Sequence, residues 1–223
     1  MNGLTYAVGD IHGCADALDR LLAAIDRHGS GRPRRLVFLG DYVDRGPDSA
    51  GVITRLRSLE TREPASVVCL MGNHEALMID AYRSGLGTTT WLENGGTATL
   101  AAYGVADPEA LPHDVLAWLS GLRTVHEDAL RYYVHAGFRP GRIGIDPDVT
   151  TRLRIREPFL GADFDFGKHV VHGHTPQKTG RPDLRRHRSN LDTACVFGRT
   201  LTAAVFTDEG AAPAEILQVG ARP

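Results

Sequence analysis

The chain has 223 residues, of which 42% are hydrophobic and 23% are charged. This composition supports a sizeable buried core and excludes a disordered chain. The formal net charge is only -2, which argues against nucleic acid or an anionic membrane as a bulk binding partner.

The first part of the chain repeats one local pattern three times, in which an apolar strand is followed by a polar glycine loop and an amphipathic helix. The predicted strands are Leu4–Val8, Arg35–Leu39 and Ser66–Met71. The predicted helices are Ala15–Arg27, Ser49–Leu59 and His74–Tyr82. Strands that alternate with helices in this way indicate a largely parallel sheet with crossover helices.

The repeated pattern of strand, glycine loop and helix ends after the third helix. Residues 84–99 contain four glycines and three consecutive threonines, and we expect an irregular insert near the site, with a short helix from Thr97. Helices are predicted over Pro108–Ser120 and Asp148–Arg156. The remaining predicted strands are Thr124–Glu127, Leu130–Val134, His169–Val171, Ser189–Leu191, Leu201–Phe206 and Glu215–Val219. Parallel units followed by short strands predict an α/β fold with two packed sheets flanked by helices.

Targeting segments and disulfides are not expected. The N-terminal residues lack a basic segment with an apolar core, and no apolar run is long enough to span a bilayer. Cys14, Cys69 and Cys195 are odd in number and widely spaced, which is typical of reduced thiols. The length fits one domain over residues 1–223, and we expect a cytoplasmic protein.

Five polar motifs each follow a predicted strand. They are Asp10-x-His12, Gly40-Asp41-x-x-Asp44-Arg45-Gly46, Gly72-Asn73-His74-Glu75, His135-Ala136-Gly137 and Gly173-His174-Thr175. Parallel strands deliver their carboxyl ends to one edge of a sheet, where open α/β sheets bind their ligands. These side chains are therefore expected to converge in space.

Carboxylates, imidazoles and an amide without thiolates suit manganese, iron or zinc. In Asp10-x-His12 the strand period of two turns both side chains in the same direction, so both can reach one ion. One aspartate can bridge two ions, because a carboxylate has two oxygens. Two ions roughly 3.5–4 Å apart can hold both oxygens of an in-line displacement. The motifs thus predict a two-metal centre that attracts phosphate.

The segments GDIHG, GDYVDRG, GNHE, HAG and GHT occur in that order between Gly9 and Thr175. This series resembles the phosphoprotein phosphatase family of calcineurin-like metallophosphoesterases. The segments Trp91-x-x-Asn94-Gly95-Gly96 and Ile155–Phe159 are similar to its bacterial branch. The resemblance implies a four-layer α/β sandwich of two packed mixed sheets flanked by helices, and a metal-dependent serine/threonine phosphatase acting on phosphorylated proteins or peptides.

The resemblance also implies a role for each motif residue. Asp10, His12 and Asp41 would bind a first metal, and Asp41 would bridge to a second metal held by Asn73, His135 and His174. His74, oriented by Asp44, would protonate the leaving oxygen, and Arg45 and Arg156 would bind phosphate. The nucleophile would be a hydroxide bridging two divalent ions, with manganese the first choice and iron or zinc the alternatives.

Some assignments stay open at this point. Arg152, Arg154 and Arg156 alternate, and the choice of Arg156 depends on the Glu-Pro-Phe that follows it. The Gly-His-Thr pattern favours His174 over His172 as the last ligand. The run Arg181–Arg188 is interpreted as a solvated turn, with a basic rim for acidic phosphosubstrates as the alternative. Trp91 fits either the core or the wall of the substrate cleft.

Three other functions compete with the phosphatase. A dinucleoside polyphosphate hydrolase ranks second, since those relatives tend to differ at Glu75 and Asp44. A nuclease or phosphodiesterase ranks third, because Pro176 stands where such relatives favour a histidine. A non-catalytic binding module is disfavoured, because it is expected to have lost at least one ligand and none is missing.

Overall fold

The first sheet is built on β1 (Leu4–Val8), whose side chains alternate between two buried environments. Tyr6 and Val8 pack with the helices on one face, and Ala7 packs against the second sheet on the other. Because both faces are covered, the strand is a continuous apolar run. The structure is a computed structural model and describes residues 3–85 and 87–221.

The first sheet has the order β10-β9-β1-β2-β3. β1 is parallel to β2 (Arg34–Phe38), and β2 is parallel to β3 (Val67–Cys69). On the other side, β9 (Thr200–Phe206) is antiparallel to both β1 and β10 (Glu215–Gly220). The three parallel strands therefore end at the same edge, as the sequence predicted.

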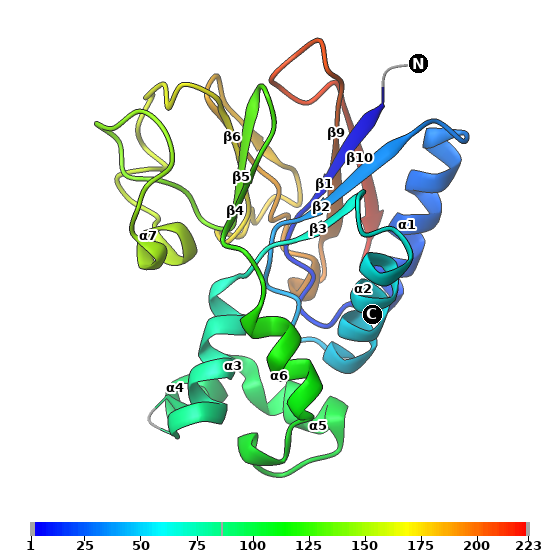
Figure 1. Ribbon diagram of the computed structural model, residues 1–223, viewed down its shortest axis with the longest axis vertical. Coiled ribbons are helices and arrows are strands. Elements are labelled where there is room, and N and C mark those ends of the chain that lie inside the picture. The colour runs from blue at the N-terminus through cyan, green and yellow to red at the C-terminus, as the bar shows by residue number, and fades with distance from the viewer. Residues whose placement is uncertain (1–2, 86, 222–223) are drawn as a thin grey trace.

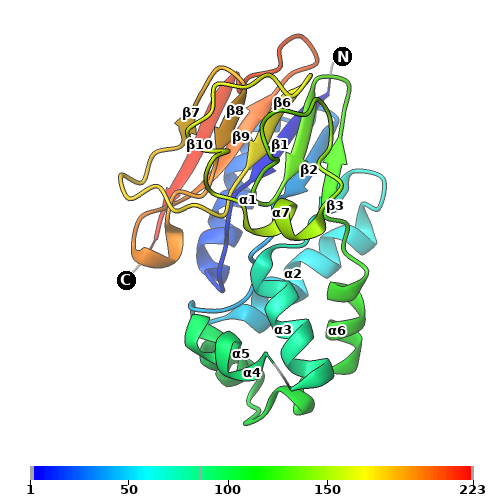
Figure 2. The same ribbon diagram turned by 90° about the vertical axis from the view of Figure 1, so that its left-hand side faces the viewer.

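The second sheet has the order β4-β5-β6-β8-β7. Its strands are β4 (Val125–Glu127), β5 (Arg131–Val134), β6 (His169–His172), β7 (Asp183–Leu184) and β8 (Arg188–Asn190). The strands β5, β6 and β8 are parallel, and the two outer strands are antiparallel to their neighbours. Tyr133 and Val171 pack between the sheets with Ala7 and Phe206. The predicted pair of mixed sheets flanked by helices is confirmed (Figure 2).

Helices cover the outer faces and one end of the sheets (Figures 1 and 2). The first sheet packs against α1 (Ala15–Gly29) and α2 (Ser49–Arg62). α3 (Asn73–Ser84), α4 (Thr88–Trp91), α5 (Thr97–Tyr103) and α6 (His113–Ser120) gather at the end opposite the N-terminus, and α7 (Val149–Arg154) flanks the second sheet. Within the described residues, no helix has both the length and the apolar character needed to span a membrane.

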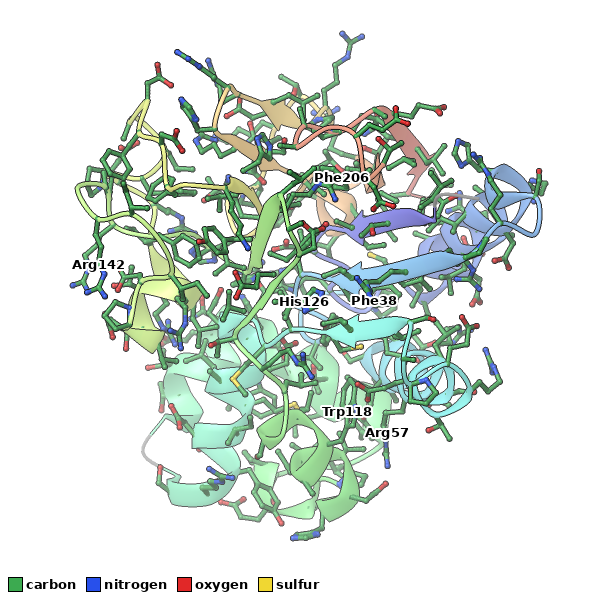
Figure 3. All side chains as sticks on the ribbon, turned by 45° about the horizontal axis from the view of Figure 1, so that its top comes forward. Phe38, Arg57, Trp118, His126, Arg142 and Phe206 are labelled. Carbon is green, nitrogen blue, oxygen red and sulfur yellow. The ribbon has the colours of Figure 1, made fainter. Side chains whose placement is uncertain are left out.

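Polar contacts attach α6 to α2. Arg57 donates a hydrogen bond to the Asp114 carboxylate at 2.7 Å, and the indole of Trp118 donates to Glu60 at 2.7 Å. Figure 3 labels Arg57 and Trp118 in this region. The predicted helix 108–120 is wrong in one respect: a 3-10 turn at Pro108–Ala110 precedes α6, which begins only at His113. Pro112 separates the two segments because its nitrogen carries no hydrogen to donate.

The segment 84–99 is more helical than predicted, and its residue 86 lies outside the described residues. α4 continues into a π-helical turn, η1 (Leu92–Gly96), and then into α5. Gly95 adopts a φ of 109°, which a residue with a Cβ rarely tolerates, and this bends the chain between the two helices. The buried ring of Trp91 then packs into the core. The expectation that this segment lies near the site is correct, as the contacts below show.

The predicted solvated turn 181–188 also needs correction. It contains β7, and its last residue, Arg188, begins β8 and is buried. The Arg188 guanidinium contacts the Asp183 carboxylate at 3.0 Å and lies over the ring of Phe159. A buried arginine persists only when its charge is paired, and here Asp183 provides the pair.

Candidate metal centre

The loops after β1 and β2 are joined through their backbones. The amides of Ile11 and His12 both donate to the carbonyl of Asp41, at 3.0 and 2.9 Å. His12 also contacts the carbonyl of Val43 through Nδ1 at 2.7 Å, which leaves Nε2 facing Asp41. Two motifs that are thirty residues apart in sequence thus form one wall of the site.

The carboxylate of Glu75 holds the Asp41 loop in an unusual conformation. Asp41, Asp44 and Arg45 have φ values of 53°, 74° and 68°, in the left-handed region that non-glycine residues avoid. Glu75 accepts hydrogen bonds from the amides of Asp41, Tyr42, Val43 and Gly72, at 2.7 to 3.2 Å. Burial raises the pKa of Glu75 to about 7. These four bonds offset the backbone strain and join the second and third motifs.

Two clusters of side chains meet at Asp41. His12, Asp41 and His74 form the first cluster, and Asp41, His135 and His174 form the second; the ligand atoms of each cluster lie within 4.8 Å of one another. Asp41 Oδ2 is 3.4 Å from His12 Nε2, and Asp41 Oδ1 is 3.4 Å from His135 Nε2. The predicted convergence of four separate loops around this carboxylate is therefore present.

Two predicted ligands adjoin these clusters. Asn73 Oδ1 is 3.0 Å from His135 Nε2, which places the amide beside the second cluster. Asp10 accepts a hydrogen bond from the amide of His174 at 3.1 Å. Burial, together with the nearby carboxylates of Asp192 and Asp41, raises the pKa of Asp10. A Cβ on Gly173 would lie 2.0 Å from Asp10 Oδ1, so the chain needs glycine there.

The structure separates the two neighbouring histidines. His174 belongs to the second cluster, and its Nε2 is buried without a hydrogen-bond partner among the described residues. His172 lies against the ring of Phe159, with ring centroids 4.9 Å apart, and belongs to neither cluster. An orphaned imidazole nitrogen among buried carboxylate and imidazole groups fits a divalent cation, and no thiolate is present to favour a softer ion.

The protonation states agree with this donor set. Burial lowers the pKa of His12 and of His174 to about 3, although Asp41 opposes the shift, so both imidazoles are neutral at pH 7. Burial raises the pKa of Asp41, but the surrounding histidines outweigh it and hold the pKa below its usual range. Neutral imidazoles around an ionised carboxylate are the forms that bind a cation.

His74 differs from the other histidines of the site. Its Nδ1 is 2.7 Å from Asp44 Oδ2, and its Nε2 lies 4.0 Å from Asp41. Burial lowers its pKa, but Asp41 and Asp44 outweigh burial and the net pKa is raised. Asp44 also accepts hydrogen bonds from Trp91 Nε1 at 2.9 Å and from Thr99 Oγ1 at 2.7 Å. The helical segment 88–103 therefore supports the Asp44–His74 pair.

A cleft of about 390 Å³ opens over both clusters. Arg45, Arg154 and Arg156 line it together with Asn94. Arg152 is not part of the lining, and its guanidinium donates to the carbonyl of Asp146 at 2.7 Å. Of the three alternating arginines, the structure thus brings Arg154 and Arg156 to the cleft. Arg45 also contacts His12 Nε2 at 2.7 Å.

Sequence reasoning gave no structural role to three residues around the site, although one of them, Glu75, belongs to the third motif. Glu75 and Thr99 make the contacts described above, and Asp192 lies close enough to raise the pKa of Asp10. Burial raises the pKa of Asp192 to about 7. Asp192 follows β8 just as the motif residues follow their strands. Its position after a predicted strand could therefore have marked it as a site residue. Thr99 gave no such indication, because its partner is distant in sequence.

The family model of calcineurin-like phosphoesterases matches residues 4–198. The chain belongs to this family. It is therefore a metal-dependent phosphoesterase, and its two clusters are consistent with a binuclear metal centre. Relatives within this family carry names for more than one phosphoester substrate.

The chain is similar to three proteins whose names refer to two different kinds of substrate. Serine/threonine-protein phosphatase 1 of Salmonella typhimurium is 32% identical over 214 residues, covering 89% of this chain and 90% of the relative. The asymmetrical bis(5'-nucleosyl)-tetraphosphatase PrpE of Anoxybacillus flavithermus is 30% identical, covering 90% and 89%. A crystal structure provisionally named a diadenosine tetraphosphatase has a TM-score of 0.71 and 26% identity, covering 100% of this chain and 95% of that one.

Proposed function

We propose that this chain is a serine/threonine phosphoprotein phosphatase that hydrolyses phosphomonoesters at two divalent cations shared by Asp41. One observation carries the proposal: the two oxygens of this carboxylate face different clusters, each 3.4 Å from an imidazole nitrogen. A carboxylate positioned between two ligand sets is the arrangement a two-metal site needs. The formal charge of two divalent cations exceeds that of their two proposed aspartate ligands, Asp10 and Asp41, and the excess attracts phosphate.

The proposed ligand sets are those implied by the family resemblance, and the convergence of the two clusters on Asp41 supports them. Asp10, His12 and Asp41 are proposed for the first cation, and Asp41, Asn73, His135 and His174 for the second. Oxygen and imidazole donors suit manganese, with iron or zinc as alternatives. When bound, the cations polarise the phosphoryl oxygens and lower the pKa of a coordinated water.

His74 is proposed as the proton donor to the leaving oxygen, although it lies within the first cluster. Its Nδ1 is engaged by Asp44, and its Nε2 is farther from Asp41 than the Nε2 of His12 is, at 4.0 Å against 3.4 Å. Asp44 stabilises the imidazolium that must hold the proton, and it fixes the ring. The Nε2 atom is left to face the cleft, which His74 lines.

Arg45 and Arg156 are proposed to bind the phosphate oxygens. Both line the cleft together with Asp41 and Asn73. A guanidinium presents two parallel N–H groups that match two phosphate oxygens. Arg154 lines the same cleft and is the alternative to Arg156.

The phosphoprotein substrate is supported by the similarity to the Salmonella phosphatase. It is also supported by Glu75 and Asp44, which are the residues at which dinucleoside polyphosphate hydrolases tend to differ. A dinucleoside polyphosphate is the second candidate, because three arginines line the cleft and more than one phosphate would match them. The PrpE relatives and the structure with a TM-score of 0.71 favour the same candidate.

The test is a comparison of kcat/KM with manganese present. The substrates are phosphoserine and phosphothreonine peptides, diadenosine tetraphosphate and a cyclic nucleotide, and Asp41→Asn serves as the blank. We expect the peptides to be turned over with the highest kcat/KM. A higher value for diadenosine tetraphosphate than for every peptide would replace the first candidate by the second.

A further inference from the structure

A second hollow of about 570 Å³ adjoins the metal cleft. We call it the Phe197 groove; its lining includes Arg156, Pro176, Lys178, Ala194, Phe197 and Arg199. Arg156, Pro176 and Phe197 also line the metal cleft, so the two hollows share a wall. The groove therefore lies directly beside the cleft that would hold the phosphate of a substrate.

The aromatic ring of Phe197 is an unusual surface feature. Phe197 ends the short 3-10 turn after Asp192 and remains 58% exposed, although its neighbour Cys195 is buried. The Arg45 guanidinium lies 5.7 Å from the ring centroid. Because Arg45 is proposed to bind phosphate, the Phe197 ring lies next to a guanidinium that would contact the phosphate of the substrate. An exposed aromatic ring at such a place is suited to contact with substrate.

The charge of the Phe197 groove has one sign. Arg156, Lys178 and Arg199 line it and no acidic side chain does. Within residues 3–85 and 87–221, none of these three cations forms an ion pair. In contrast, Arg185 and Arg188 of the run 181–188 are paired with Asp183. The groove thus brings three cations that are unpaired among the described residues beside the metal cleft, whereas two arginines of the run are neutralised by Asp183.

We propose that the Phe197 groove binds the residues flanking the phosphorylated residue of an acidic peptide. An apolar or aromatic side chain of the peptide packs on Phe197, and Asp or Glu side chains contact Lys178 and Arg199. The polar side chains of the groove are the three cations and the Thr175 hydroxyl, so the groove offers charged donors to the carboxylates of an acidic peptide. This inference rests on the proposed phosphoprotein substrate and names its chemistry.

The experiment compares two phosphoserine peptides of equal length. One carries Glu and Leu beside the phosphoserine, and the other carries Gln and Ala. For the wild-type chain we expect kcat/KM for the acidic peptide to be higher by roughly tenfold at low salt, and the ratio to fall as salt screens the charges. The double variant Lys178→Gln/Arg199→Gln and the single variant Phe197→Ala should each lower the ratio, because each removes one of the two contacts, and the salt dependence should be lost only in the double variant.

The matched control is Arg185→Gln/Arg186→Gln, which removes two cations from outside the groove and should leave the ratio at the wild-type value. Because the readout is a ratio within one protein, partial loss of folding cancels. An unchanged ratio in both groove variants overturns the inference. Loss of diadenosine tetraphosphate turnover with an unchanged peptide ratio also overturns it, and assigns the groove to a nucleotide.

The proposed function fails in a distinguishable way. If the wild-type chain hydrolyses p-nitrophenyl phosphate but no phosphopeptide, the phosphoprotein proposal is wrong and the peptide groove is wrong with it. If the wild-type chain hydrolyses both peptides equally and the variants match it, only the groove inference is lost.

Discussion

The indole nitrogen of Trp91 donates to both carboxylate oxygens of Asp44, at 3.0 and 2.9 Å. The same carboxylate accepts from Thr99 Oγ1 at 2.7 Å and contacts His74 Nδ1 at 2.7 Å. Three side chains thus converge on Asp44, and two of them come from the segment 88–103. This segment therefore holds Asp44 in place, and under the proposed mechanism it would act on the reaction through the orientation of His74.

Trp91→Phe is expected to lower kcat by roughly ten- to a hundredfold, since a hydrogen bond to a charged group contributes about 1.5–3 kcal/mol. Phenylalanine retains an aromatic ring in the core but removes the donor. Thr99→Val should act in the same direction, and the exposed Thr89→Val serves as the control. The measurement is kcat with bound metal quantified in parallel. Metal loss in Trp91→Phe would show that the contact supports the ligands and not the proton donor.

His74→Asn and Asp41→Asn are expected to separate proton donation from metal binding. His74→Asn should keep both cations while kcat falls by about 10²- to 10⁴-fold, the usual contribution of a general acid. Asp41→Asn should lose metal and activity together. The substitution replaces one of the two oxygens of the shared carboxylate by an amide NH2 group and removes its negative charge. Elemental analysis of the purified variants measures how much metal each one retains. If His74→Asn releases metal, His74 is a ligand of the first cluster.

Glu75→Gln is expected to destabilise the fold by about 2–4 kcal/mol, because an amide has one acceptor oxygen for the four backbone donors that Glu75 now satisfies. The measurement is urea unfolding with and without manganese. Glu63→Gln is the control, since Glu63 contacts Arg34 near the surface at 3.4 Å. Equal unfolding midpoints for the two variants would show that the loop does not depend on this carboxylate.

Metal removal is expected to lower the melting temperature. Asp10, Asp41 and Asp192 are all buried, and the cations that would balance their charge are removed by a chelator. Differential scanning fluorimetry with added chelator, and then with manganese restored, follows the effect. The melting temperature of Asp41→Asn should not respond to manganese. If manganese also leaves the melting temperature of the wild-type chain unchanged, the result would contradict a buried two-metal centre.

Arg156→Lys is expected to raise KM for p-nitrophenyl phosphate by roughly tenfold, because an ammonium cannot contact two phosphate oxygens as a guanidinium does. Arg154→Lys is the matched comparison, since Arg154 lines the same cleft. Inhibition by inorganic phosphate provides a second readout of the same contact. A larger effect in Arg154→Lys would transfer the phosphate-binding role to that residue.

Much of the fold was predictable because its determinants are local. The three apolar strands β1, β2 and β3, each followed by a glycine loop and a helix, indicated a parallel sheet, and that sheet is present. The short helix predicted from Thr97 is present as α5, but the two-residue strand β7 and the helical turns over residues 88–96 were not predicted. β7 is too short to show a period of two, and the φ of 109° at Gly95 depends on how the two helices meet.

The sequence alone indicated which side chains would converge: His12 and Asp41 follow parallel strands of the first sheet, and His135 and His174 follow parallel strands of the second. Tertiary structure decided their partners. Glu75 under the Asp41 loop, Trp91 and Thr99 on Asp44, and the Phe197 groove are contacts between segments that no local period relates. The reason is physical: strand and helix periods orient a side chain within its own element, whereas the packing of whole loops and helices selects what it meets.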